Sequence, residues 1–227
     1  MGVLDAIEPP RDPPVAPARR LLPGGGRVQH ARAVAAACAS LAEIEAALRT
    51  FDGCALSQTA TRLCFADGNP QASLMLIGEA PGAEEDRQGL PFVGPSGQLL
   101  DRMLAAIGLD RGQVWITNIV FWRPPGNRPP TAGEIAVCQP FLERQIELVR
   151  PRRLLFVGGA AARALLGQDE GVTKLRGRPF LSRGDGLGRF PADAVFPPAY
   201  LLRQPLQKKL AWRDLMALRR QLDGVAP

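Results

Sequence analysis

Four short apolar runs, separated by helical patterns, constrain the fold of this chain more than any other feature. The runs occupy residues 74–77, 114–117, 154–157 and 194–196. The segments between and after them carry the apolar spacing of helices, at 97–107, 134–149, 160–166 and 206–222. Continuous apolar strands that alternate with helices are typical of a parallel sheet buried on both faces. We therefore predict a three-layer α/β/α fold with a central four-stranded parallel sheet.

The first 52 residues differ from the rest of the chain in composition. Six prolines lie between Pro9 and Pro23, and three glycines follow at 24–26. Such a stretch cannot bury a core, so we predict a disordered tail over residues 1–29. An N-terminal helix over 30–52 follows, because one helical face gathers its apolar residues, Val34, Cys38, Leu41, Ile44 and Leu48. Residues 53–227 then form the main domain.

The histidine and cysteine counts exclude several kinds of site. The chain has 227 residues, one His and four Cys. The single imidazole, His30, excludes any site that needs two, and we expect it to be exposed and without a role. Unevenly spaced cysteines do not fit a secreted disulfide scaffold. No apolar run approaches the roughly 18 residues of a membrane span. We expect a cytoplasmic monomer without a targeting segment.

The charge is unevenly distributed along the chain. The net charge is +6, but residues 1–110 carry 9 Arg against 13 Asp and Glu, a balance of −4. Residues 111–227 carry 19 Lys and Arg against 9 Asp and Glu, a balance of +10. Such a basic half can follow a phosphate backbone, and it can equally be a solvated basic surface.

The segments that follow the predicted strands are the places for chemistry, because ligands bind beyond the carboxyl ends of parallel strands. The first of these segments, 78–86, holds Glu79 between glycines that let a ligand approach the backbone. It contains neither a phosphate-binding Gly-Lys-Ser/Thr nor a dinucleotide fingerprint. The segment is either a carboxylate site for a neutral or cationic ligand or a plain turn.

Two further side chains near strand ends suit the recognition of a flat ligand. Phe92 lies between Pro91 and Gly94, where it serves either as a stacking platform or as an anchor for its loop. Asn118 ends the second predicted strand, and its amide offers a donor and an acceptor to a base edge. The alternative for Asn118 is a cap of the loop that follows.

Together these segments resemble the family-4 uracil-DNA glycosylases. The resemblance covers about residues 50–223 in order and with similar spacing. The matching pieces are 65–70, 78–86, 89–94, 96–100, 117–119, 123–125, 127–128 and 200–203. As a set, these pieces are strongly specific for the superfamily, although no single piece is.

The resemblance implies an enzyme that flips uracil out of DNA and cuts its bond to deoxyribose, leaving an abasic site. It implies that Phe92 stacks on the uracil and that Asn118 binds its Watson–Crick edge. Gly78, Glu79 and Ala80 would line the pocket. Glu79, helped by Glu85, would stabilise the positive sugar of the transition state or orient the attacking water.

The resemblance also implies contacts with single- or double-stranded DNA around the pocket. A loop comprising Pro197, Tyr200, Leu201, Leu202 and Arg203 would wedge into the groove and hold the gap left by the base. Its alternative is a core turn that leads into the last helix. Phosphates would meet the basic side chains Arg123, Arg128, Lys208 and Lys209.

The chain departs from the family at the metal. Family members typically hold a [4Fe–4S] cluster on four cysteines, and the matching positions here are Phe51, Cys54, Trp122 and Cys138. Two thiolates cannot bind a four-cysteine cluster. A four-cysteine cluster would also need Cys38, which lies on a helix face, and Cys64, which lies at an apolar position of the family pattern. We therefore expect no metal and no cofactor, with aromatic side chains filling the volume.

A second departure concerns catalysis. The family motif His-Pro-Ser/Ala-Tyr reads Pro197-Pro198-Ala199-Tyr200 here. The missing imidazole would donate a hydrogen bond to uracil O2, and proline has neither a side-chain donor nor an N–H. We expect a weakened uracil-DNA glycosylase. A silent protein that binds uracil-containing or single-stranded DNA and a different nucleobase-processing activity remain as alternatives.

Overall fold

A computed structural model describes residues 24–166, 171–178, 180–181 and 190–224 of the chain. Its centre is a six-stranded sheet in the order β1-β3-β2-β4-β6-β5. The strands are β1 (Asp67–Gly68), β2 (Leu74–Gly78), β3 (Val114–Asn118), β4 (Arg153–Val157), β5 (Phe180–Leu181) and β6 (Pro191–Val195). The four inner strands are parallel, whereas β1 and β5 pair antiparallel at the edges. The predicted four-stranded parallel sheet is confirmed, with two short edge strands added.

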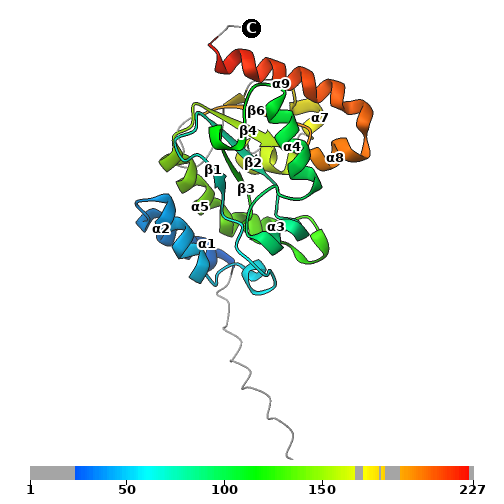
Figure 1. The fold of residues 1–227 in the computed structure, drawn as a ribbon. Helices are drawn as coiled ribbons and strands as arrows, with labels where there is room; N and C mark the ends of the chain where they lie inside the picture. Colours follow the sequence, from blue (N-terminus) through cyan, green and yellow to red (C-terminus); the bar gives the residue numbers. More distant parts are fainter. Residues whose placement is uncertain (1–23, 167–170, 179, 182–189, 225–227) are drawn as a thin grey trace, which may run out of the picture.

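Helices cover both faces of this sheet, which confirms the three layers (Figure 1). They are α1 (Gly24–Ala37), α2 (Leu41–Thr50), α3 (Ala83–Gln88), α4 (Pro95–Ala105), α5 (Ala132–Val149), α6 (Gly159–Leu166), α7 (Val172–Leu175), α8 (Pro198–Arg203) and α9 (Lys208–Leu222). Side chains alternate along each strand between the two layers. In β2, Leu74 and Leu76 pack with α4, α8 and α9, whereas Met75 and Ile77 pack with α1, α2, α5 and α6. None of the described helices is long and apolar enough to cross a bilayer.

The predicted N-terminal helical region over 30–52 is present, but it forms two helices instead of one. Helix α1 begins at Gly24, inside the predicted tail, and residues 1–23 of that tail lie outside the described residues. The helical conformation is interrupted before Ser40, the N-cap of α2. The Ser40 hydroxyl accepts a hydrogen bond from the Glu43 N–H, 3.2 Å away. The Glu43 carboxylate in turn accepts from the Ala39 N–H. Such caps satisfy N–H groups that a helix start leaves without partners.

The last part of the chain also differs in detail from the prediction. The expected helix over 206–222 is α9, preceded by a 3₁₀ turn, η4 (Pro205–Gln207). The segment predicted as a DNA wedge is mostly helical, since α8 spans Pro198–Arg203. Helix α8 and the segments at the ends of β2, β3 and β4 border one cavity at the carboxyl edge of the sheet.

The break at Ser40 gives a test that distinguishes one helix from two. With two helices, Ser40→Ala removes a cap and lowers the free energy of unfolding by about 1 kcal/mol. In a continuous helix, the same change would place alanine at an interior position and raise stability. Chemical denaturation of both proteins measures the sign, and stabilisation by Ser40→Ala would contradict the two-helix structure.

Candidate active site

A cavity of about 520 Å³ opens at the carboxyl ends of the parallel strands. It gathers the predicted residues Glu79, Ala80, Glu85, Phe92, Asn118, Arg128, Pro197 and Arg203. Sequence reasoning missed other residues of its wall, including Ser96, Pro124 and Asn127. Segments far apart in the chain therefore build one site, as the strand-end argument predicted.

Gly78, Phe92 and Asn118 meet at one side of this cavity. A Cβ atom at Gly78 would lie 2.4 Å from Asn118 Oδ1 and 2.4 Å from Phe92 Cζ. Only glycine therefore lets the amide and the ring approach the same backbone. Asn118 is buried, and its Oδ1 has no hydrogen-bond partner among the described residues. A buried acceptor without a partner costs free energy, which a donor on a ligand in this cavity would recover.

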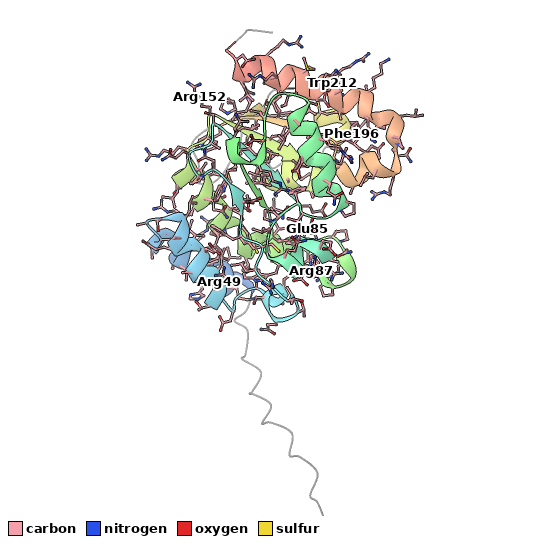
Figure 2. All side chains as sticks on the ribbon, viewed as in Figure 1. Arg49, Glu85, Arg87, Arg152, Phe196 and Trp212 are labelled. Carbon is pink, nitrogen blue, oxygen red and sulfur yellow. The ribbon has the colours of Figure 1, made fainter. Side chains whose placement is uncertain are left out.

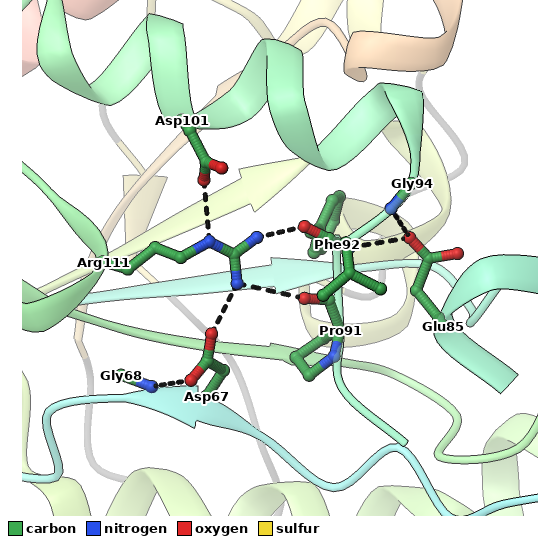
Figure 3. A network of polar contacts seen from close by, with 9 residues as sticks. Asp67, Gly68, Glu85, Pro91, Phe92, Gly94, Asp101 and Arg111 are labelled. Carbon is green, nitrogen blue, oxygen red and sulfur yellow. Dashed lines mark hydrogen bonds and ion pairs between the residues drawn. The ribbon is translucent and has the colours of Figure 1, made fainter. Parts of the chain in front are cut away.

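The backbone at Phe92 has an uncommon conformation that its surroundings hold in place. Its φ is 54°, a left-handed value that non-glycine residues rarely adopt. Arg111 donates hydrogen bonds to the carbonyl groups of Phe92 and Pro91. The same guanidinium pairs with Asp67 at 2.5 Å and with Asp101 at 2.8 Å (Figure 3). Arg111 therefore ties the Phe92 loop to β1 and to α4.

Glu85 holds the same loop from the opposite side. Its Oε1 accepts hydrogen bonds from the N–H groups of Val93 and Gly94, each at 2.9 Å (Figure 3). Its Oε2 accepts from the Gly82 N–H at 3.1 Å and caps α3. Both oxygens are thus occupied by the backbone. This geometry gives Glu85 a positioning role, and its catalytic role stays a prediction.

Glu79 provides the carboxylate that remains available to a ligand. Its side chain forms no hydrogen bond with another described residue, and it lines the cavity. Partial burial raises the pKa of this carboxyl above the ordinary value, and the nearby Arg163 opposes the rise. A carboxylate without a structural partner can interact with charge that develops on a substrate.

The α8 segment corrects the predicted DNA wedge. Leu201 is 1% exposed and packs in the core with α4, as the alternative of a core turn predicted. The Tyr200 ring packs against the Phe196 ring at a tilt of 33°, with centroids 4.9 Å apart. Leu202 is 41% exposed, and Arg203 lines the cavity. Leu202 and Arg203 are therefore the exposed residues of the predicted wedge, whereas Pro197 lies in the cavity wall.

The predicted phosphate-binding residues differ in their surroundings. Arg128 donates two hydrogen bonds to the Glu134 carboxylate, at 2.9 and 2.7 Å, which partly neutralises its charge. The Arg123 Nε donates to Asn127 Oδ1 at 2.7 Å. Lys208 and Lys209 are exposed at the start of α9, outside the cavity.

The region that corresponds to the iron–sulfur site of family-4 uracil-DNA glycosylases does not fit a four-cysteine cluster. Cys54 and Cys138 are buried and in hydrogen-bonding contact, but aromatic rings occupy the other two positions. Phe51 packs edge-on against Phe141, at a centroid distance of 5.0 Å, and Trp122 packs against Phe121. The described residues contain no group of three or more His, Cys, Asp or Glu placed to bind a metal ion.

The other two cysteines and His30 have partners of their own. The Cys64 thiol donates to the Glu85 carbonyl at 3.0 Å, and burial raises its pKa to about 12. The Cys38 thiol donates to the Val34 carbonyl within its own helix. His30, expected to have no role, is exposed but stacks on Phe51, with centroids 5.6 Å apart.

Comparisons with known proteins show the family of this chain. A model of the uracil DNA glycosylase superfamily matches residues 65–216. The chain belongs to this superfamily. It is 36% identical to a type-4 uracil-DNA glycosylase of Sulfurisphaera tokodaii, over 79% of this chain and 84% of the relative. A type-4 uracil-DNA glycosylase of Thermotoga maritima is 40% identical over 66% of this chain and 77% of the relative. The predicted resemblance is confirmed.

The Arg111 network gives a testable consequence for stability and substrate binding. Arg111→Met leaves Asp67, Asp101 and two carbonyl groups without their shared donor, so unfolding should require about 1–3 kcal/mol less free energy. Because the Phe92 loop is then less firmly held, Arg111→Met should also raise KM for a uracil-containing oligonucleotide by a larger factor than it lowers kcat.

Arg87→Met is the matched control, because Arg87 lies at the surface of the same helix as Glu85 (Figure 2) and, among the described residues, pairs only with Glu84 at i,i+3. Such an exposed pair contributes little to stability. Equal effects of the two substitutions on stability and KM would contradict the positioning role of Arg111.

Proposed function

We propose that this protein removes uracil from DNA by hydrolysing the N-glycosidic bond and leaves an abasic site. The observation that carries the proposal is the unpartnered Asn118 Oδ1 beside the Phe92 ring, in a cavity that also contains the Glu79 carboxylate. A ring and an amide suit a flat base with a polar edge. Type-4 uracil-DNA glycosylases are among the relatives of this chain, which supports the same activity here.

The cavity selects its base through the Asn118 amide. Uracil presents an N3–H donor and an O4 acceptor on its Watson–Crick edge. The amide oxygen of Asn118 accepts from the first, and its NH₂ donates to the second. Cytosine has an acceptor at N3 and an amine at C4, so it would leave both groups of Asn118 mispaired. A buried polar site of this kind discriminates strongly against the wrong partner.

Glu79 acts on the sugar while the bond breaks. The C1′–N1 electron pair leaves with the uracil, and positive charge develops on the deoxyribose ring. The ionised Glu79 carboxylate stabilises this charge and orients a water molecule toward C1′. The water forms the new C1′–O bond, and its proton passes to the carboxylate or to solvent. Arg163 favours the ionised form that this step requires.

Pro197 limits the rate, because the departing uracil anion receives no hydrogen bond from this position. It lies in the cavity wall and caps α8 with extended backbone, at φ −66°. The lack of a hydrogen-bond donor at position 197 also favours a second candidate function, namely binding of uracil-containing DNA without cleavage.

We propose that the protein works without an iron–sulfur cluster, as a monomer acting on single- or double-stranded DNA in the bacterial cytosol or nucleoid. The aromatic packing of Phe51 and Trp122 in place of two cysteines supports the first part. Double- and single-stranded substrates both present the flipped base that the cavity would accept.

The role of Glu79 predicts a loss of rate and a change in pH dependence. Glu79→Gln should lower kcat by about 10²–10³. In the unmodified protein, kcat should fall as the pH drops through the raised pKa of Glu79, since protonation removes the charge. That fall begins at a higher pH than for an ordinary carboxyl group, and Glu79→Gln abolishes it. Alkaline cleavage of a uracil-containing oligonucleotide measures the rate.

Glu84→Gln is the control for this substitution, because Glu84 is exposed on α3 and pairs with Arg87. An unchanged rate in Glu79→Gln would exclude the carboxylate from the reaction. Binding of uracil-containing DNA without any cleavage by the unmodified protein would support the silent alternative.

The missing donor predicts a gain of function. Pro197→His should raise kcat, by as much as the 10²–10³ (about 3 kcal/mol) that one such donor supplies. Pro124→His is the control, since Pro124 lines the same cavity in a different segment. A Pro197→His variant that folds but cleaves no faster than the unmodified protein would contradict this account of the rate.

The absence of a cluster predicts a colourless protein. Protein purified without oxygen should contain no stoichiometric iron or acid-labile sulfide and should not absorb near 400 nm. Iron and sulfide at about four atoms each per chain would contradict the proposal and require Cys38 or Cys64 to move.

A further inference from the structure

Cys54 and Cys138 form a pair of thiols that the cavity at the strand ends does not use. Both are free and buried, and the Cys138 thiol donates a hydrogen bond to the Cys54 sulfur. Cys54 precedes the 3₁₀ turn η1 (Ala55–Gln58), whereas Cys138 lies in α5. Because aromatic rings fill the other two positions of the family's metal site, these thiols face one another and not a cluster. Two thiols in contact can close to a disulfide once one of them is oxidised.

A small cavity of about 200 Å³ reaches Cys54. It lies between α1, the start of η1 and the start of α5, and α1 packs against α5 (Figure 1). Its wall also contains Arg27, Thr131 and Glu134. Arg27 Nε is buried and has no hydrogen-bond partner among the described residues. A buried donor without a partner costs free energy, which a small ligand with an acceptor oxygen would recover. The Glu134 carboxylate disfavours an anion, so the cavity suits a neutral oxygen ligand.

The Cys54 thiol differs in chemistry from the cysteines outside the pair. The hydrogen bond from Cys138 lowers the pKa of the Cys54 thiol, and two backbone N–H groups of η1 lower it further, against the opposing effect of burial. Burial instead raises the pKa of Cys38 and of Cys64, whose thiols donate to backbone carbonyl groups. The thiolate is the form that oxidants attack, so Cys54 is the cysteine prepared to react.

We propose that Cys54 is a modification site for a hydroperoxide and that Cys138 converts the product to a Cys54–Cys138 disulfide. The Cys54 sulfur attacks one peroxide oxygen, the O–O bond breaks, and the departing hydroxide takes the thiol proton and leaves as water. Arg27 Nε donates a hydrogen bond to the departing oxygen. The Cys138 sulfur then attacks the sulfenic sulfur of Cys54, and the sulfenic oxygen leaves with the Cys138 proton as a second water. The two thiols lose two electrons, which the peroxide gains.

The mass of the intact chain tests the disulfide without any reference to DNA or to the proposed glycosylase activity. The full chain, reduced and then freed of reductant, would be treated with equimolar hydrogen peroxide. We expect it to lose the mass of two hydrogen atoms and to yield one pair of peptides linked through Cys54 and Cys138. An unchanged mass, or oxidation that begins at Cys38 or Cys64, would overturn the proposal. This readout uses the unmodified protein and so does not depend on how a variant folds.

Two cysteine variants separate the steps. Cys138→Ser should stop at the sulfenic acid of Cys54, which dimedone captures as an adduct on that residue. Cys38→Ser is the matched control, because Cys38 is also a buried thiol, and it should still form the disulfide at the unmodified rate. A dimedone adduct on another cysteine of Cys138→Ser, with Cys54 unlabelled, would contradict the assignment of Cys54 as the residue attacked.

Arg27 provides the test of the cavity. Arg27→Met should slow disulfide formation by about tenfold or more, the factor that a hydrogen bond to a developing charge supplies. Arg32→Met is the control, since Arg32 is exposed on the same helix and does not line the cavity. The rate is followed by intact mass in samples quenched at successive times. Equal rates in the two variants would overturn the role of Arg27 and of this cavity in the reaction.

Discussion

The clamp on the Phe92 loop is the interaction on which the site depends. Arg111 holds the loop through two carbonyl groups and anchors itself on Asp67 and Asp101. Glu85 holds the next residues through two N–H groups. Charge-assisted bonds from both sides offset the cost of the left-handed backbone at Phe92, which is of the order of 1–3 kcal/mol. The ring can therefore face Asn118 before any ligand arrives.

The position of the Phe92 loop also explains why residues 78 and 97 are glycines. A Cβ at Gly97 would lie 1.7 Å from the Phe92 carbonyl oxygen, and one at Gly78 would meet both the ring and the Asn118 amide. The helix α4 and the strand β2 thus approach the loop more closely than any side chain would permit. Preorganisation of this kind lowers the entropic cost of binding a base.

Much of the fold and of the site could be predicted from the sequence. Strands buried on both faces have continuous apolar sequences, which predict β2, β3 and β4. The same runs predict that Glu79 and Asn118 lie at strand ends. The break at Ser40 was missed because the apolar face continues across it, and a cap depends on hydrogen bonds that periodicity does not reveal. The burial of Leu201 and the positioning role of Glu85 were not predicted, because the α4 core and the backbone of residues 82–94 are partners that periodicity does not reveal.

The central claim is that this cavity releases uracil, and one product measurement tests it most directly. A duplex and a single strand, each with one uracil, would be incubated with the full chain and examined by mass spectrometry. The account predicts free uracil and an oligonucleotide with an abasic site, formed in equal amounts and about 10²–10³ times more slowly by Glu79→Gln. Intact oligonucleotide at high enzyme concentration, with the DNA still bound, would contradict it.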